Sequence, residues 1–134
     1  DSAVRLDPSY PVWANSNLMY AYFMGGRHAA VAPVFDRTPR DSLTEVDFVY
    51  RAASYAALGQ AAAARAAVAD ALRFAPGLSI EGIAAQSWWS EAERARLIDT
   101  MRAAGFPACA TAAGANAIAP AKRLPECAGA VASG

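Results

Sequence analysis

The chain has 134 residues, which is enough for one domain with a hydrophobic core and too short to favour two. Its twelve basic and twelve acidic residues give a formal net charge of zero, so it lacks the basic surface typical of nucleic-acid-binding and membrane-surface proteins. No apolar run approaches the roughly 20 residues of a membrane span. We therefore expect a protein or peptide partner, and neither nucleic acid nor a membrane.

The chain starts at Asp1 rather than at methionine, and its first residues do not resemble a signal peptide. We interpret it as a processed or excised piece of a longer protein. More than a quarter of the residues are alanine, which favours helices and lets them approach one another closely. The composition thus favours closely packed helices over a core of large side chains.

Two helices are expected in the N-terminal part of the chain. Pro11 disfavours helix in the residues before it, so the first helix is expected from residue 11 or 12 to Met24. The two glycines that follow end it. A short second helix is expected over residues 29–35, and Pro39 limits its C-terminal end.

The second helical hairpin has the clearest signals. Asp41 or Ser42 is expected to cap a helix whose apolar residues recur at helical spacing up to Leu58. After a turn at Gly59, an alanine-rich helix is expected over residues 61–74. The proline and glycine that follow this helix close the hairpin.

A third, shorter hairpin is expected next. A helix over residues 79–87 is weakened by a central glycine, which costs about 1 kcal/mol relative to alanine. Ser90 and Glu93 have the spacing of a capping box, in which each side chain bonds the backbone amide of the other residue. The helix that they open is expected to run to Ala104, with Gly105 as its C-terminal stop.

Residues 107–134 are rich in alanine, glycine and proline, and composition alone predicts a coil-rich, disordered tail. We therefore divide the chain into a helical domain, 1–106, and this tail. Cys109 and Cys127 both lie in the tail, and an even count there permits a disulfide. A reduced pair is the open alternative. A metal site is not expected, because two thiols without a nearby histidine cannot complete a tetrahedral shell.

Five residues of the second hairpin have the spacing of a tetratricopeptide (TPR) repeat. An aromatic residue late in the first helix, a glycine turn, two small residues at the helix crossings and a closing proline stand at the consensus offsets: Tyr55, Gly59, Ala64, Ala71 and Pro76. Gly26 precedes this turn by close to the roughly 34-residue TPR period. The resemblance implies an all-α, right-handed superhelix of about two and a half to three antiparallel helix pairs.

The stretch from Asp7 to Pro107 also resembles the C-terminal TPR region of bacterial (alphaproteobacterial) class III adenylate cyclase-like proteins. The matching segments are 7–13 (DPSYPVW), 21–27 (AYFMGGR), 51–59 (RAASYAALG) and 76–80 (PGLSI). This resemblance implies a regulatory, protein-interaction module of a larger signalling protein, with any catalysis outside this chain. The TPR class is commonly intracellular, so a cytoplasmic location is expected.

The repeat numbering predicts a concave groove lined by apolar and aromatic side chains. The groove-facing positions are Trp13, Ser16, Asn17, Tyr20, Phe23, Met24, Val46, Val49, Tyr50 and Ala53. Such a surface suits an extended apolar segment better than a charged terminus. The ligand is expected to be a protein or peptide segment, with the chain's own tail or a second copy among the candidates. The open alternative is that these aromatic residues belong to the core.

Trp88 and Trp89 are adjacent, so the two rings cannot both face one core. One is expected to cap the third hairpin, and the other to contact the tail or a neighbouring chain.

The most consistent function is therefore non-catalytic binding, with an oligomerisation element of the parent protein as the alternative. His28 is the only histidine, and together with scattered carboxylates it forms no catalytic constellation. No enzyme activity, no cofactor and no metal are expected of this chain.

Overall fold

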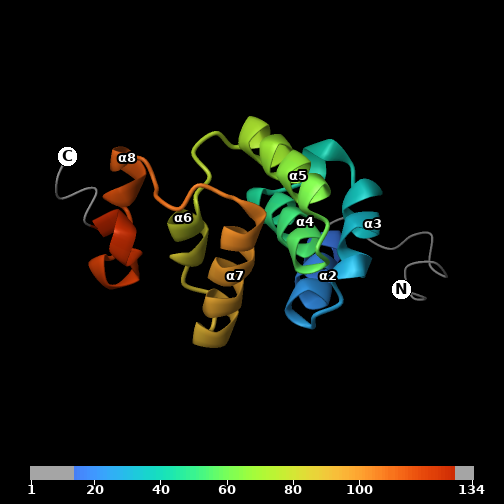
Figure 1. Ribbon diagram of the computed structural model, residues 1–134, viewed down its shortest axis with the longest axis horizontal. Coiled ribbons are helices and arrows are strands. Elements are labelled where there is room, and N and C mark those ends of the chain that lie inside the picture. Colours follow the sequence, from blue (N-terminus) through green and yellow to red (C-terminus); the bar gives the residue numbers. More distant parts are fainter. Residues whose placement is uncertain (1–13, 129–134) are drawn as a thin grey trace.

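The computed structural model describes residues 14–128 (Figure 1), and over these residues the chain is all-helical. The all-α fold class is confirmed. The α-helices are α2 (Ala14–Met24), α3 (Val31–Asp36), α4 (Glu45–Ala57), α5 (Ala61–Phe74), α6 (Ile80–Ala84), α7 (Glu91–Ala104) and α8 (Ala112–Ala115). Short 3₁₀ turns occupy His28–Ala30, Arg40–Ser42 and Pro120–Lys122.

Helix α4 is the centre of the molecule, because α2, α3, α5 and α7 all pack against it. It can occupy this position because its buried residues lie on more than one face. The largest fully buried apolar side chains of the helices come from five of them: Met19 and Phe23 of α2, Val31 and Val34 of α3, Phe48 and Val49 of α4, Ile80 of α6, and Leu97 and Met101 of α7.

The N-terminus of α4 is capped differently from the sequence prediction. Asp41 and Ser42 lie in a 3₁₀ turn that ends before the helix, and Thr44 is the N-cap residue. The Asp47 carboxylate accepts a hydrogen bond from the Thr44 backbone N–H at 2.9 Å, and a second from the Ser16 hydroxyl at 2.8 Å. This buried aspartate therefore fixes the start of α4 and also ties it to α2.

The hairpin of α4 and α5 matches the predicted turn and the predicted helix over 61–74. Gly59 has a φ of 77°, a left-handed conformation that glycine adopts without a steric penalty. The Gln60 N–H reaches back to the Tyr55 carbonyl at 2.9 Å and closes the end of α4. Ala64 and Ala71 are buried at the contact between the two helices.

The third hairpin contains the predicted capping box of Ser90 and Glu93 at the start of α7. Gly105 ends α7 with a φ of 97°, as predicted. Helix α6 ends at Ala84, three residues earlier than the sequence predicts. Its C-terminal end is closed by the Trp89 indole N–H, which donates to the Ile83 carbonyl at 2.8 Å.

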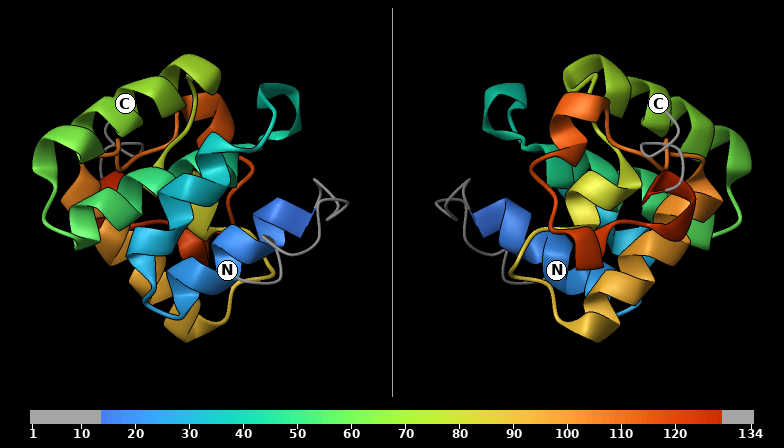
Figure 2. Two further views of the ribbon diagram at one scale, coloured as in Figure 1. Left: turned by 90° about the vertical axis from the view of Figure 1, so that its right-hand side faces the viewer. Right: turned by 90° about the vertical axis from the view of Figure 1, so that its left-hand side faces the viewer.

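Residues 107–128 fold onto α6 and α7, at the end of the molecule opposite α3 (Figure 1). The carbonyls of Pro107 and Ala108 accept hydrogen bonds from the backbone N–H groups of Ile80 and Glu81. The Arg94 side chain then joins the Ala84 carbonyl of α6 to the Lys122 carbonyl of the tail. Figure 2 shows this segment, orange to red, in front of α6 and α7 in its right-hand view. This part of the tail is thus more ordered than its composition predicts.

Candidate binding surface

Four of the predicted groove residues lie in the core instead of on an open surface: Phe23, Val49, Tyr50 and Ala53. Helix α7 packs on the face of α4 that would line the concave surface of a TPR superhelix. The Tyr50 ring there meets the Trp89 ring edge-on, with 6.5 Å between the ring centres. This part of the groove prediction is therefore corrected. The alternative, that the aromatic residues belong to the core, holds for these positions.

The remaining predicted positions keep some exposure. Ser16, Met24 and Val46 are half-buried, whereas Asn17 and Tyr20 are exposed. Ser16 is already bound to Asp47, so its hydroxyl has a structural role. Trp13 lies outside the described residues.

The adjacent tryptophans do not both face the core, as predicted, and Trp89 closes the end of α6 in the third hairpin. A contact of Trp88 with a neighbouring chain stays a prediction. Trp89 is buried, and its ring lies 6.4 Å from that of Tyr20. Trp88 keeps 64% of its surface exposed, the highest value among the large hydrophobic residues of the described chain. The two indole rings lie 5.8 Å apart. Buried Trp89 therefore supports an exposed Trp88, and Tyr20 extends the same aromatic surface.

A cleft of about 350 Å³ opens beside Trp88, between the start of α4 and the segment that follows α6. We call it the Trp88 cleft. Its six lining residues are Thr44, Glu45, Val46, Ile83, Gln86 and Trp88. Val46 is the only predicted groove residue among them. The repeat spacing did not identify the other five residues. The cleft forms where the third hairpin packs against the start of α4, and the TPR repeat pattern does not predict this contact.

Gln86 lines the Trp88 cleft and also a second pocket beside Ser79 and Gly82. Its Oε1 atom is buried and has no hydrogen-bond partner among the described residues. A buried carbonyl oxygen without a partner costs about 1–3 kcal/mol. Because this atom is closed to solvent, the groups that the cleft offers a ligand are its apolar wall and the exposed Glu45.

The polar groups beside the aromatic surface have defined protonation states at neutral pH. The Tyr20 hydroxyl donates to the Glu93 carboxylate, and this contact raises the pKa of Tyr20. The Ser90 backbone N–H and then the Tyr20 hydroxyl lower the pKa of Glu93. Burial, followed by the nearby Asp47 charge, raises the pKa of Tyr50. Both phenols are thus neutral and Glu93 is charged, with the Arg96 charge close to it.

His28 packs edge-on against Phe23, and its Nδ1 atom lies 3.3 Å from the Ser54 hydroxyl oxygen. Burial and then the Arg96 charge lower the pKa of His28. Ser54 is itself buried, so a substrate does not reach this pair from solvent. Within residues 14–128, no group of three or more His, Cys, Asp or Glu side chains is placed to hold a metal ion.

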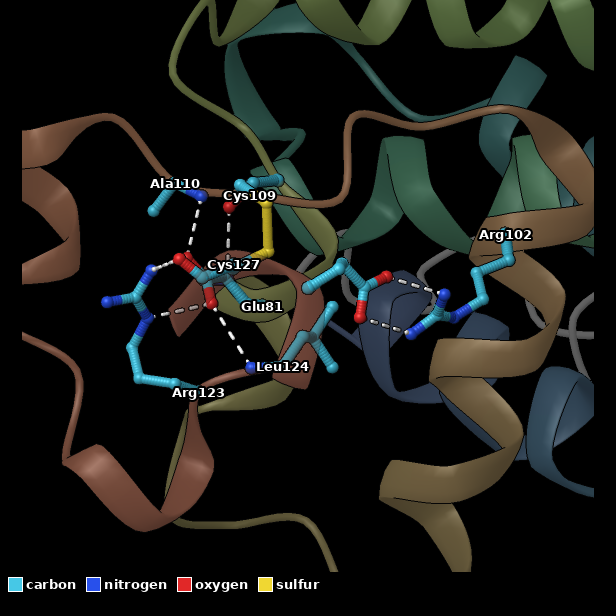
Figure 3. The surroundings of a disulfide bond; sticks show 10 residues. Glu81, Arg102, Cys109, Ala110, Arg123, Leu124 and Cys127 are labelled. Atoms are coloured by element: carbon cyan, nitrogen blue, oxygen red, sulfur yellow. Dashed lines mark hydrogen bonds and ion pairs between the residues drawn. A yellow bond between two sulfur atoms is a disulfide. The ribbon is translucent and has the colours of Figure 1, made fainter. Parts of the chain in front are cut away.

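A second polar cluster holds the tail, and Figure 3 shows its arrangement. The fully buried Glu81 carboxylate accepts hydrogen bonds from the Ala110 N–H at 2.9 Å, the Arg123 side chain at 2.9 Å and the Leu124 N–H at 3.3 Å. Burial opposes ionisation, but these donors outweigh it and lower the pKa of Glu81. Cys109 and Cys127 form a disulfide next to this cluster.

This anchoring argues against the tail as the ligand of the predicted groove. The hydrogen bonds that join residues 107–128 to the preceding chain reach α6, the residue after it, and α7. None of those formed within the described residues reaches Tyr20, Phe23 or Val49. The expectation that the tail fills this groove stays a prediction.

No model of a known protein family matches this chain, and neither a curated protein nor a solved structure matches it. The resemblance to adenylate cyclase-like proteins thus stays a prediction. Every helix within residues 14–128 is too short or too polar to cross a membrane.

Proposed function

We propose that this chain is a non-catalytic protein-interaction module that binds an apolar segment of a partner protein at the Trp88 cleft. The observation that carries the proposal is the exposure of Trp88 beside a cleft with an apolar wall. Tryptophan is the residue type most enriched among energetic hot spots of interfaces. Exposed apolar patches next to a polar rim commonly mark interaction sites.

The TPR interpretation and the signalling parent belong to the same proposal. The α4–α5 hairpin supports it, since its glycine turn and buried alanines stand at the offsets of the repeat. We place the ligand at the Trp88 cleft instead of along the whole concave face, because α7 covers the central part of α4. The regulatory role in an adenylate cyclase-like protein rests on the sequence resemblance.

The cellular compartment is a separate question. Disulfides persist mainly in oxidising compartments, so the bond between Cys109 and Cys127 fits an exported protein better than the cytoplasmic one that the repeat class suggests. Alkylation of thiols in freshly lysed cells, followed by mass analysis, distinguishes the two. Complete labelling of both cysteines would support the cytoplasm, and no labelling would support export.

The binding proposal is tested by selecting peptides from a random display library on the full chain and measuring their affinity for variants. We expect Trp88→Ala to weaken binding at least tenfold, because an anchor residue contributes roughly 2 kcal/mol or more. Leu58→Ala is the matched control, since Leu58 is also an exposed large apolar residue but lies at the other end of α4. Equal binding by the Trp88 variant and the wild type would refute the proposal.

Oligomerisation remains the second candidate, because the same exposed tryptophan could pack on another copy of the chain. Light scattering over a range of concentrations decides this point. A mass that rises with concentration and returns to the monomer value in Trp88→Ala would favour self-association over a separate partner.

A further inference from the structure

We propose that the Trp88 cleft accepts a lysine or arginine side chain of the bound peptide. This inference rests on the proposed function and specifies its ligand: the anchor of the partner is a basic side chain whose apolar stem lies on the wall of the cleft. The walls of the cleft suit the stem of such a side chain, and the Glu45 carboxylate suits its charge.

The walls suit a long aliphatic stem that ends in a cation. Val46, Ile83 and Trp88 provide the apolar surface. Lysine and arginine bury their methylene groups along such surfaces and keep the charged group at a polar edge. A cation over the Trp88 indole face is also attracted by the negative face of the ring.

The charged group of the cleft is the Glu45 carboxylate. It is exposed and forms no ion pair with any residue between 14 and 128. A purely apolar ligand would leave this charge without a partner. An ammonium or guanidinium group at the end of the stem donates charge-assisted hydrogen bonds to it.

No basic residue of the cleft competes for the Glu45 carboxylate, since none of the six lining residues is cationic. Arg40, which precedes the start of α4, is bound to Asp70 at 2.8 Å. The N-terminus of α4 would by itself favour an anion, but Glu45 occupies its first turn and lines the cleft. Glu45 is therefore the only charged residue of the lining, and its charge complements a basic side chain.

The test uses the full chain and three synthetic peptides, acetyl-Gly-Leu-X-Leu-Gly-amide with lysine, norleucine or glutamate at X. Norleucine has nearly the same stem as lysine but lacks its charge. The indole N–H signal of Trp88, assigned with Trp88→Ala, reports binding by NMR. We expect the lysine peptide to bind roughly tenfold more tightly than the norleucine peptide, with the advantage falling as salt screens the ion pair.

The variant Glu45→Gln removes the charge and is expected to abolish the advantage of lysine over norleucine. Glu91→Gln is the matched control: Glu91 is the first residue of α7, as Glu45 is of α4, but it does not line the Trp88 cleft. The control should leave all three affinities unchanged. Circular dichroism verifies that both variants remain folded.

The outcomes separate this inference from the proposed function. Equal binding of the lysine and norleucine peptides would overturn the basic anchor and leave apolar binding intact. Tightest binding of the glutamate peptide would overturn the charge argument. No shift of the Trp88 signal with any of the peptides at millimolar concentration would overturn the basic anchor, whereas the proposed function would still be decided by the library selection.

Discussion

At the scale of single residues, Glu81 is the clearest case of a charge that the fold needs. It is fully buried, yet three donors from the tail surround its carboxylate. Its partner Arg123 keeps only 10% of its side chain exposed. Removing one member of a buried ion pair leaves the other charge without compensation, which is more costly than losing the pair as a whole.

We expect Glu81→Ala to lower the free energy of unfolding by about 3 kcal/mol, because it strands the Arg123 charge and two backbone N–H groups. Urea unfolding measures the change. Glu126→Ala is the control, since Glu126 pairs with Arg102 at 2.7 Å but both side chains are more than 40% exposed. An exposed pair contributes at most about 1 kcal/mol. Similar losses in the two variants would contradict this account.

The same residue predicts how stability depends on pH. The pKa of Glu81 in the folded protein lies below its ordinary value of 4.5, so folding favours the charged form. This contribution is complete above the unfolded pKa and is lost as the pH falls through the folded one. Unfolding curves below pH 4.5 should therefore converge for the wild type and Glu81→Ala.

At the scale of elements, α7 connects the aromatic surface, the core and the tail. It packs on α4 through Leu97 and Met101, and its first turn holds Glu93 beside Tyr20. The start of this helix depends on the Ser90 hydroxyl, which accepts from the Glu93 N–H at 3.1 Å. The Ser90 cap therefore supports the contacts that α7 makes with α4 and with Tyr20.

Ser90→Ala is expected to destabilise the protein by about 1 kcal/mol, the usual cost of losing an N-cap side chain. Thermal unfolding followed by circular dichroism provides the measurement. Thr111→Ala removes a similar cap from α8, where the Thr111 hydroxyl accepts from the Gly114 N–H. Because α8 has only four residues, the loss of its cap should lower the midpoint temperature of unfolding much less than the loss of the Ser90 cap. The reverse order would show that α7 does not hold the core together.

The elements also show what the sequence can and cannot predict. The turns at Gly59 and Gly105 and the cap at Ser90 were predictable, because each depends on the conformation of a few consecutive residues. The burial of Val49 and Ala53 was not, since it depends on which helix of the third hairpin meets α4. The cap of α4 was also missed, because Asp47 reaches back to Thr44 from inside the helix.

At the scale of the whole molecule, order in the tail comes from long-range contacts that composition does not reveal. Cys109 and Cys127 are 18 residues apart and join the two sides of a segment that Glu81 anchors from within. Replacing both cysteines by alanine should cost about 3 kcal/mol in the chain-entropy account. In this variant, the rate of amide hydrogen exchange should increase much more in residues 108–127 than in α4. Uniform acceleration across the chain would contradict a local role.

The anchoring of the tail to Glu81 also has a kinetic consequence. The α4–α5 hairpin forms from residues close in sequence, whereas Glu81 meets partners 29 to 43 residues away, and contacts of that range form more slowly. Cys109 and Cys127 are only 18 residues apart, so the same reasoning has the two thiols meeting before Glu81 reaches its distant partners. The covalent bond would then hold the tail as a closed loop before it docks on α6, and trapping free thiols at successive refolding times would reveal this order of assembly.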